Sequence, residues 1–449
     1  MPPRELPGFY FDVERNRYFP LSSRPPPSPS VSTSLSQVQK QHDQPSQRRR
    51  TLWNYPASKT TSAGRAREAS VLLHGRLAAT SRGCSESVRW PFSGARRVCA
   101  FRTTPTHQFM GDSYGWLYSR TRTETSSEMD PCDDIEQLEA WIPDLSLAVH
   151  SEISALCTTE TLRVGVCFGP VTKICVQDVG VPGRTQLLHL SAVHDVRAAS
   201  LQGRALVLGA ADNVVFLADL DASDHTAVRM LPTRSDVFTV AQHENLIYAG
   251  TRAGNVLRFD TRLNAKGSAQ VLFESGPRND NTGSFNRANP QPRSSVVFVQ
   301  PIHAVQQLVV GYMDGRLGTY DLRFPRPTAQ YAVTYAGNPS SLSCNGRLGI
   351  TLDPSERFLF AAGADHRLRA WALDSGAPVA SSASPSPSPS PYAPSTSRTA
   401  VDGDSSHNPF TMRFATDFSA LQVVDADDGP GQVLWASGGS EVWRWRLGV

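Results

Sequence analysis

Two stretches decide the fold: Ala249 to Arg262 (AGTRAGNVLRFDTR) and Val310 to Arg323 (VGYMDGRLGTYDLR). In each stretch a glycine is followed ten residues later by an aspartate and twelve residues later by an arginine, and the two copies lie 61 residues apart. The glycines are Gly250 and Gly311, and the charged pairs are Asp260 with Arg262 and Asp321 with Arg323. Identical internal spacing predicts one repeated structural unit that carries the same charged pair each time.

Five further segments share this template of small residues, a tight turn and alternating apolar residues. We predict that each of the seven forms the second and third strands of a four-stranded sheet, joined by a short hairpin. Asp314 and Gly315 are expected to form a two-residue turn, since both tolerate positive φ. The other segments are Phe109 to Arg120, Val164 to Val179, Leu208 to Leu220, Ala361 to Asp374 and Ala436 to Leu447.

A polar residue opens an apolar stretch some 25 to 28 residues before the aspartate in four of the units. This spacing resembles the WD repeat, and we expect each such residue to lie near the aspartate at the end of its third strand. The Gly-His and Trp-Asp dipeptides typical of that repeat are absent, so the repeats are degenerate. The pairs are His150 with Asp178, His194 with Asp219, Ser235 with Asp260 and Ser295 with Asp321.

The predicted fold class is all-β: a seven-bladed WD-repeat β-propeller with a largely disordered basic N-terminal arm. Residues 87–449 number 363, and removal of three polar insertions leaves about 40 residues per blade, the usual WD period. The insertions are predicted at 121–144, 264–293 and 376–407 and are expected to be surface loops. The propeller would be preceded by an aromatic motif at 1–19, a disordered basic linker at 20–64 and a helical lead-in at 65–86.

Charge is distributed unevenly along the chain. Residues 1–108 hold 17 Lys+Arg and 6 Asp+Glu, a net charge of +11, and the remainder holds 27 and 35, a net charge of −8. The Arg48-Arg49-Arg50 run is compatible with a nuclear import signal or a nucleic-acid patch. A solvated linker explains the same residues.

The cysteine and hydropathy patterns limit the cellular compartments in which we expect the protein. The 7 cysteines form no C-x-x-C pair and no His-containing zinc spacing, which favours a reducing environment. No apolar run has the length of a membrane span. We therefore expect the protein in the nucleus, the cytoplasm or both, with no membrane partner and as a monomer within a complex.

The N-terminal run Leu6 to Phe19 (LPGFYFDVERNRYF) alternates aromatic residues on both sides of a polar turn. This pattern predicts a two-stranded hairpin. An isolated hairpin is marginally stable in water, so it is expected to dock, either on a partner as a peptide-like element or on its own propeller as a cap. The motif residues are Pro7, Gly8, Phe9, Tyr10, Asp12, Asn16, Arg17, Tyr18 and Phe19.

This N-terminal run, followed by a degenerate propeller, resembles one family. It is similar to the WD-repeat substrate receptors of cullin-4 ubiquitin ligases, of the damaged-DNA-binding-protein-1 and cullin-4-associated factor 4 type. The signature of that receptor class is W-D-x-R at the end of a third strand. Here Phe259 and Tyr320 replace the tryptophan, while both Asp-x-Arg pairs match.

The resemblance implies that Phe259, Asp260, Arg262 and Tyr320, Asp321, Arg323 bind the cullin-4 ligase adaptor. The planar guanidinium, with its five N–H donors, suits bidentate contacts that a lysine cannot reproduce. A surface turn closed by Asp-x-Arg explains the same residues. The sixth and third segments depart from the pattern, with Ala372 and Asp374 in one and Asp219 and Asp221 in the other.

Catalysis finds little support. Gly111 to Gly115 (GDSYG) matches the hydrolase G-x-S-x-G elbow, but that elbow needs a helix after the serine, and Trp116 to Tyr118 is predicted to be a strand. Asp425 to Gly429 lacks the glutamate of a calcium loop. We expect no enzyme activity, no cofactor and no metal.

Two functions follow from these patterns. The first is a non-enzymatic substrate receptor that grips a ligase adaptor and presents an unknown substrate protein for ubiquitylation. The second is a propeller scaffold for another nuclear complex concerned with chromatin or RNA. In the second case the basic arm would contact nucleic acid, which is otherwise not an expected partner.

Overall fold

The computed structural model describes residues 9–12, 17–20, 83–87, 96–122, 141–181, 183–221, 228–263, 269–274, 293–303, 306–326, 329–339, 347–379, 409–410, 412–426 and 431–447. The chain divides into two compact units, Met1–Thr60 and Thr61–Val449. All regular structure in the described residues is β. No described helix has the length and apolar character to cross a membrane.

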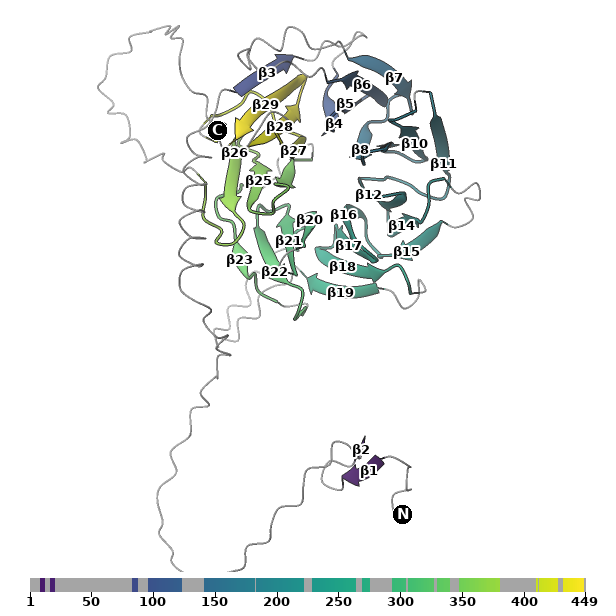
Figure 1. Ribbon diagram of the computed structural model, residues 1–449, viewed down its shortest axis with the longest axis vertical. Helices are drawn as coiled ribbons and strands as arrows, with labels where there is room; N and C mark the ends of the chain where they lie inside the picture. Colours follow the sequence, from purple (N-terminus) through teal and green to yellow (C-terminus); the bar gives the residue numbers. More distant parts are fainter. Residues whose placement is uncertain are drawn as a thin grey trace, which may run out of the picture. The chain divides into compact units, whose positions relative to one another are not determined.

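The second unit is a ring of seven antiparallel sheets, which confirms the predicted seven-bladed propeller (Figure 1). Blade one consists of β4 (Val98–Thr103), β5 (His107–Asp112), β6 (Trp116–Thr121) and β7 (Ile142–Ser146). Blade two consists of β8 (Ile153–Thr158), β9 (Leu162–Cys167), β10 (Thr172–Asp178) and β11 (Thr185–Leu190). Blade three consists of β12 (Ala198–Gln202), β13 (Ala205–Gly209), β14 (Asn213–Leu217) and β15 (Arg229–Pro232).

The remaining blades follow in chain order. Blade four consists of β16 (Val237–His243), β17 (Leu246–Thr251), β18 (Asn255–Asp260) and β19 (Ala269–Glu274), and blade five of β20 (Val296–Ile302), β21 (Gln307–Tyr312), β22 (Leu317–Asp321) and β23 (Val333–Thr334). Blade six consists of β24 (Ile350–Leu352), β25 (Phe358–Ala362) and β26 (Leu368–Ala372). Blade seven consists of β27 (Ala420–Asp425), β28 (Gln432–Gly438), β29 (Glu441–Leu447) and β3 (Gly83–Ser87).

The seven segments chosen from the sequence are the second and third strands of their blades, as predicted. Six of the blades have the expected four strands, and three strands are described in blade six. These strands are buried on both faces because each blade is packed between two others. All six residues of β9 are buried, for example. Strands of this kind are continuously apolar rather than alternating.

The core consists of seven apolar clusters, and each cluster fills the space between two neighbouring blades. The cluster around Val256, Phe273, Val296 and Tyr320 joins blades four and five. The cluster around Phe101 and Trp435 joins blade one to blade seven and so closes the ring. Stability therefore arises from contacts between neighbours, as in other repeat folds.

Packing between blades explains the glycine in the second strand of blades one and four. A Cβ atom on Gly250 would lie 2.4 Å from Cγ1 of Val296, the residue that opens the first strand of the next blade. A Cβ atom on Gly111 would lie 2.5 Å from Cβ of Ile153, which has the same place in blade two. At Gly250 and Gly111 the glycine is required because the neighbouring blade approaches the second strand closely. At Gly311 the nearest atom to an added Cβ would be Cδ1 of Leu317 in the same blade, at 3.0 Å, so the close approach there is within the blade.

Blade seven contains strands from both ends of the second unit. β3 pairs with β29, from Glu441 with Ser87 to Trp445 with Gly83, and forms the outermost strand (Figure 1). The predicted helical lead-in at 65–86 is therefore wrong for residues 83–86, which are strand. Residues 65–82 of the lead-in lie outside the described residues.

The predicted insertions also need correction. Ala269–Glu274 was assigned to the 264–293 loop but is β19, the fourth strand of blade four. Residues 142–144, assigned to the 121–144 loop, begin β7. In the 376–407 insertion, Pro378 forms a bridge to Trp371, and the buried Val379 donates its N–H to the carbonyl of Ala370. The apolar residues that complete each sheet occur in segments dominated by polar residues, which conceals them.

The turn between β21 and β22 differs from its prediction as well. The N–H of Gly315 donates to the carbonyl of Tyr312 over 3.0 Å, and Gly315 has a φ of 89°. Asp314 does not have positive φ. The connection is thus a longer turn with a single left-handed residue at its end, and only the glycine is conformationally required there.

The first unit contains the hairpin predicted at the N-terminus. β1 (Phe9–Asp12) and β2 (Arg17–Pro20) pair antiparallel, with Tyr10 opposite Phe19 and Asp12 opposite Arg17. Pro7, Gly8 and Asn16 of the predicted motif lie outside the described residues, as does the linker at 20–64 apart from Pro20.

Candidate protein-docking surface

Four consecutive blades end their third strand in the same turn. In each, Oδ1 of the aspartate accepts the backbone N–H of the residue two positions later, over 3.0, 3.0, 3.0 and 2.9 Å in chain order. This is the local side chain to backbone bond that favours aspartate in turns. The four aspartates are Asp178, Asp219, Asp260 and Asp321.

A second hydrogen bond anchors the same turn to its own blade. The N–H of Thr261 donates to the carbonyl of Asn245 over 2.8 Å, and the N–H of Leu322 donates to the carbonyl of Gln306 over 3.0 Å. Both acceptors lie in the turn between the first and second strands. The residues after each aspartate are therefore held in a fixed direction on one face of the ring.

Blades four and five add an arginine to this turn. Nε of Arg262 donates to Oδ1 of Asp260 over 2.9 Å, and Nη2 donates to Oδ2 over 2.7 Å. Arg323 makes the same pair of bonds to Asp321 over 2.9 and 2.6 Å. The sequence prediction of a shared structural unit is confirmed down to the side-chain geometry.

The arginine side chains are exposed, with 67% of Arg262 and 59% of Arg323 accessible to solvent. Hydrogen bonds from Arg262 lower the pKa of Asp260 to about 2, and those from Arg323 lower the pKa of Asp321. Both carboxylates are therefore charged at neutral pH. The bonds to Asp260 use two of the five N–H donors of the Arg262 guanidinium, so its other edge can meet an acceptor on a partner.

An exposed apolar residue follows each arginine. Leu263 is 50% exposed and Phe324 is 73% exposed. In blade two the corresponding residue, three positions after Asp178, is Val181, also 50% exposed. We call Arg262, Leu263, Arg323 and Phe324 the rim patch.

The rim patch occupies one face of the ring. Its two turns connect the third to the fourth strand in blades four and five, and equivalent turns of a propeller emerge on the same side. Blades four and five are direct neighbours, because Val256 and Phe273 pack against Val296 and Tyr320. Leu263 and Phe324 were not among the predicted site residues, although an apolar residue directly after the Asp-x-Arg turn is visible in both copies of the sequence.

The aromatic residues at the tryptophan position have another role than the one predicted. Phe259 is fully buried, and Tyr320 is 5% exposed and stacks on Phe273 with a centroid separation of 4.0 Å. The hydroxyl of Tyr320 forms a 3.2 Å hydrogen bond with that of Tyr312. The prediction that Phe259 and Tyr320 contact the partner is therefore wrong. Both side chains lie inside the blade, beneath the turn.

The prediction that the polar residue opening each repeat lies near the aspartate at the end of the third strand is wrong. Oγ of Ser235 accepts the N–H of Ala253 over 3.1 Å, and Oγ of Ser295 donates to the carbonyl of Arg252 over 2.9 Å. These contacts lie in the turn before β18, whereas Asp260 is the last residue of β18, seven residues after Ala253. A strand rises about 3.3 Å per residue, so Ser235 and Asp260 lie on opposite faces of the ring.

The GDSYG segment forms a hairpin turn. β5 ends at Asp112, β6 begins at Trp116, and Gly115 has a φ of 81°. The buried Asp112 accepts the backbone N–H groups of Tyr114 and Trp116 and the hydroxyl of Tyr118. Since a strand follows Ser113 where a helix would be needed, the hydrolase elbow is not formed.

The cysteines and the other side chains that can bind a metal are further candidates for a site. Cys99, Cys157, Cys167 and Cys175 are free thiols, and burial is the largest effect that raises the pKa of Cys99 to about 12. Among the described residues, no group of three or more His, Cys, Asp or Glu side chains could hold a metal ion.

Comparison with known proteins supports the repeat type. The chain is 31% identical over 134 residues to an uncharacterised WD-repeat-containing protein of Caenorhabditis elegans. This match covers 29% of the chain and 20% of that protein. No family model matches the chain. This part of the chain is therefore similar to a WD-repeat protein, and the seven blades agree with that repeat type.

Similar solved structures include two propeller-length matches. The computationally designed Ika8 protein is 15% identical with a TM-score of 0.46, over 80% of this chain and 98% of that one. Raptor from Chaetomium thermophilum is 10% identical with a TM-score of 0.48, over 82% of this chain and 29% of that one.

Proposed function

We propose that the protein is a non-enzymatic substrate receptor of a cullin-4 RING ubiquitin ligase and that the rim patch docks the ligase adaptor. The observation that carries this proposal is the repeated exposed pairing of a guanidinium with an apolar side chain on two neighbouring blades. Arginine and aromatic residues are the types most enriched where binding energy concentrates in protein interfaces.

The geometry suits binding at low entropic cost. Each guanidinium is already held by two bonds to its aspartate, so little rotamer freedom remains to be lost on docking. Asp260 and Asp321 keep the arginines oriented, and Leu263 and Phe324 offer apolar area beside them. A partner with acidic groups flanking an apolar pocket would complement this arrangement.

The mechanism we propose is proximity. The receptor would hold a substrate protein on another surface while the adaptor binds the rim patch, which raises the effective concentration of the substrate at the ligase. No chemical step is assigned to the receptor itself. We propose that it acts in the nucleus, the cytoplasm or both, with the N-terminal hairpin as a further docking element.

Capture of the adaptor from cells tests this proposal. The doubly substituted Arg262→Ala, Arg323→Ala protein should fold and lose the damaged-DNA-binding-protein-1 adaptor, while Arg252→Ala should retain it. Arg252 is a suitable control because it is 69% exposed and pairs with Asp236 over 3.3 Å in the turn before β18, on the other face of the ring. Equal recovery of the adaptor with the double variant would refute the assignment.

The second candidate is a WD-repeat scaffold for a nuclear complex that contains chromatin or RNA. The net charge of +11 in residues 1–108 supports it, because lysine and arginine that neutralise phosphates give strongly salt-dependent binding. Replacing Arg48, Arg49 and Arg50 by glutamine should weaken nucleic-acid binding and leave adaptor capture unchanged if both functions exist.

A further inference from the structure

An exposed arginine of blade three is held between two phenyl rings from the neighbouring blades. Cζ of Arg197 lies 4.9 Å from the ring centre of Phe168 and 5.1 Å from that of Phe238. Phe168 belongs to the turn after β9 in blade two, and Phe238 is the second residue of β16 in blade four. Three successive blades therefore meet at this one guanidinium.

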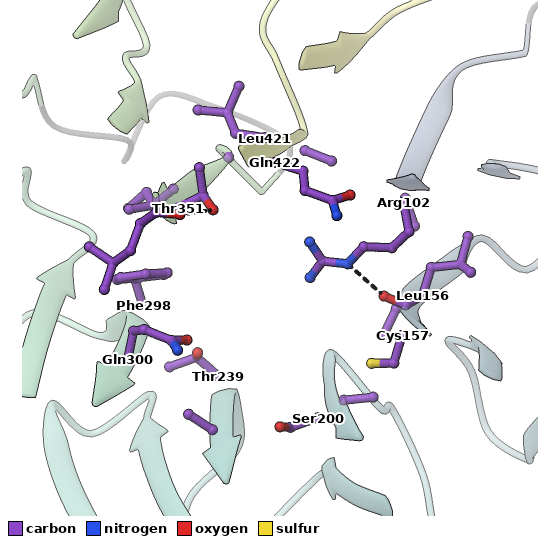
Figure 2. Close-up of a pocket in the computed structure, with 18 of the residues that line it drawn as sticks. Arg102, Leu156, Cys157, Ser200, Thr239, Phe298, Gln300, Thr351, Leu421 and Gln422 are labelled. Carbon is purple, nitrogen blue, oxygen red and sulfur yellow. Dashed lines mark hydrogen bonds between the residues drawn. The ribbon is translucent and has the colours of Figure 1, made fainter. Parts of the chain in front are cut away.

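The arginine lies on the face of the ring opposite the rim patch. Ser200 of β12 and Thr239 of β16 line the central cavity of about 530 Å³ (Figure 2). Arg197 and Phe238 come before these residues on the chain, at the start of the same two first strands. First and third strands of a blade run in the same direction, and the rim patch follows the ends of third strands. The two surfaces are therefore separated by the length of a strand.

The backbone and the side chain of Arg197 are both fixed. Its N–H donates to the carbonyl of Gly209 over 2.9 Å, and its carbonyl accepts Nη1 of Arg347 over 3.2 Å. Phe238 is the extra residue of a β-bulge, a device that re-aims side chains. The rings hold the guanidinium by cation–π attraction, which leaves its N–H donors unused. This side chain forms no hydrogen bond with the described residues.

Carboxylates neutralise other arginines on the same face but not Arg197. Asp195 and Asp212 belong to the adjoining loops, and neither forms an ion pair with Arg197. Among the described residues, Arg197 is thus a cation without a counter-ion. The paired arginines of this face are Arg96 with Asp112, Arg97 with Glu152, Arg252 with Asp236, Arg316 with Asp314 and Arg369 with Asp365.

This arrangement favours one carboxylate over an extended polyanion. The fork of a guanidinium can make two parallel hydrogen bonds to a single carboxylate. A nucleic-acid strand instead needs several lysine or arginine side chains to neutralise successive phosphates. The carboxylates already paired on this face would repel such a strand. Phe168 and Phe238 are half-buried, so they also offer apolar contact to residues beside an acidic side chain.

We propose that this face binds an acidic segment of another protein and that Arg197 receives a carboxylate from it. The binding itself does not depend on the cullin-4 assignment. That the segment belongs to the substrate rests on the proposed function, in which the adaptor occupies the rim patch and leaves the opposite face to the substrate.

Fluorescence anisotropy of a fluorescein-labelled hexaglutamate peptide, titrated with the full-length protein at low salt, tests the proposal. We expect saturable binding to the parent and an affinity lower by about tenfold or more in Arg197→Gln, as for lost hydrogen bonds between charged groups. Arg197→Lys keeps the charge without the fork and should also bind more weakly. It replaces Arg197→Gln if that variant does not fold. A hexaglutamine peptide should not bind.

Three controls with the melting temperature of the parent should keep its affinity for hexaglutamate. Arg252→Gln removes a paired arginine from the same face. The Arg262→Ala, Arg323→Ala protein lacks the guanidinium groups of the rim patch, and the Arg48→Gln, Arg49→Gln, Arg50→Gln protein lacks the arginine run of the N-terminal arm.

Three results would overturn the proposal: no saturable binding, equal affinity in a folded Arg197 variant, or a loss confined to the rim-patch or N-terminal variant. Adaptor capture separates this inference from the proposed function. Arg197→Gln should still capture the adaptor, and a parent protein that binds hexaglutamate through Arg197 without capturing the adaptor would refute the proposed function alone.

Discussion

Nη2 of Arg323 lies 2.6 Å from Oδ2 of Asp321, and the equivalent atoms of Arg262 and Asp260 lie 2.7 Å apart one blade earlier. Two exposed ion pairs with the same geometry cannot contribute much to folding, because water and salt screen charges at a protein surface. Their repetition beside exposed apolar residues is the basis of the docking role that we propose.

Replacing Phe324 by alanine should weaken adaptor binding without unfolding the propeller. Phe324 is 73% exposed, so its removal leaves the core unchanged, while its loss from an interface should cost about 1 to 2 kcal/mol. Surface plasmon resonance with the purified adaptor measures the change. Val271→Ala, which removes a 40% exposed residue of β19, should have no effect, and equal losses for both would contradict a role specific to the rim patch.

The Asp260 and Arg262 pair should persist to low pH. The folded pKa of Asp260, about 2, lies below its ordinary value near 3.8. Its small stabilising contribution is therefore complete above about pH 4 and is lost as the pH falls through about 2. NMR titration of the Asp260 carboxyl checks this value. In Arg262→Ala the pKa should rise towards 3.8, and an unchanged pKa would mean that the backbone, not the guanidinium, holds the carboxylate.

Substituting Gly250 by alanine should destabilise the propeller. The added Cβ would lie 2.4 Å from Cγ1 of Val296 and 2.6 Å from Cγ2 of Thr239, which is an overpacking that typically costs about 1 to 3 kcal/mol. Chemical denaturation measures the loss. Adding Val296→Ala should recover part of it. Gly180→Ala, whose Cβ would approach nothing closer than Oδ1 of Asp178 at 3.5 Å, should be nearly neutral.

Truncation separates the two units. A chain that starts at residue 61 keeps β3 and should melt at the temperature of the full protein. A chain that starts at residue 88 lacks β3 and exposes β29 as a long sheet edge, so it should melt lower and aggregate more readily. Differential scanning calorimetry compares them, and equal melting temperatures would show that β3 adds no stability.

Local sequence patterns were enough to predict the fold because most blades are formed by one continuous segment that packs against the adjacent blades. The seven hairpins were recognisable since each contains a tight turn between two apolar strands, and the same spacing located Asp260 and Asp321 at strand ends. The first and fourth strands were harder to find. β19 and β3 lie in polar segments, and only their pairing with β18 and β29 identifies them.

The candidate site was found in part for the same reason. The repeated Asp-x-Arg motif is visible in the sequence, but the solvent exposure of a side chain is not. Phe259 and Tyr320 were therefore predicted to contact a partner although both are buried. Leu263 and Phe324 resemble ordinary core residues until the turn places them in solvent.

Docking of the adaptor on the rim patch is tested most directly by isothermal titration calorimetry with the purified full-length protein. The affinity for the adaptor is compared between the parent and the Arg262→Ala, Arg323→Ala variant. The proposal predicts a loss of about 2 kcal/mol or more, roughly a thirtyfold weaker complex, with an unchanged melting temperature. An affinity equal to that of the parent in the folded double variant would contradict it.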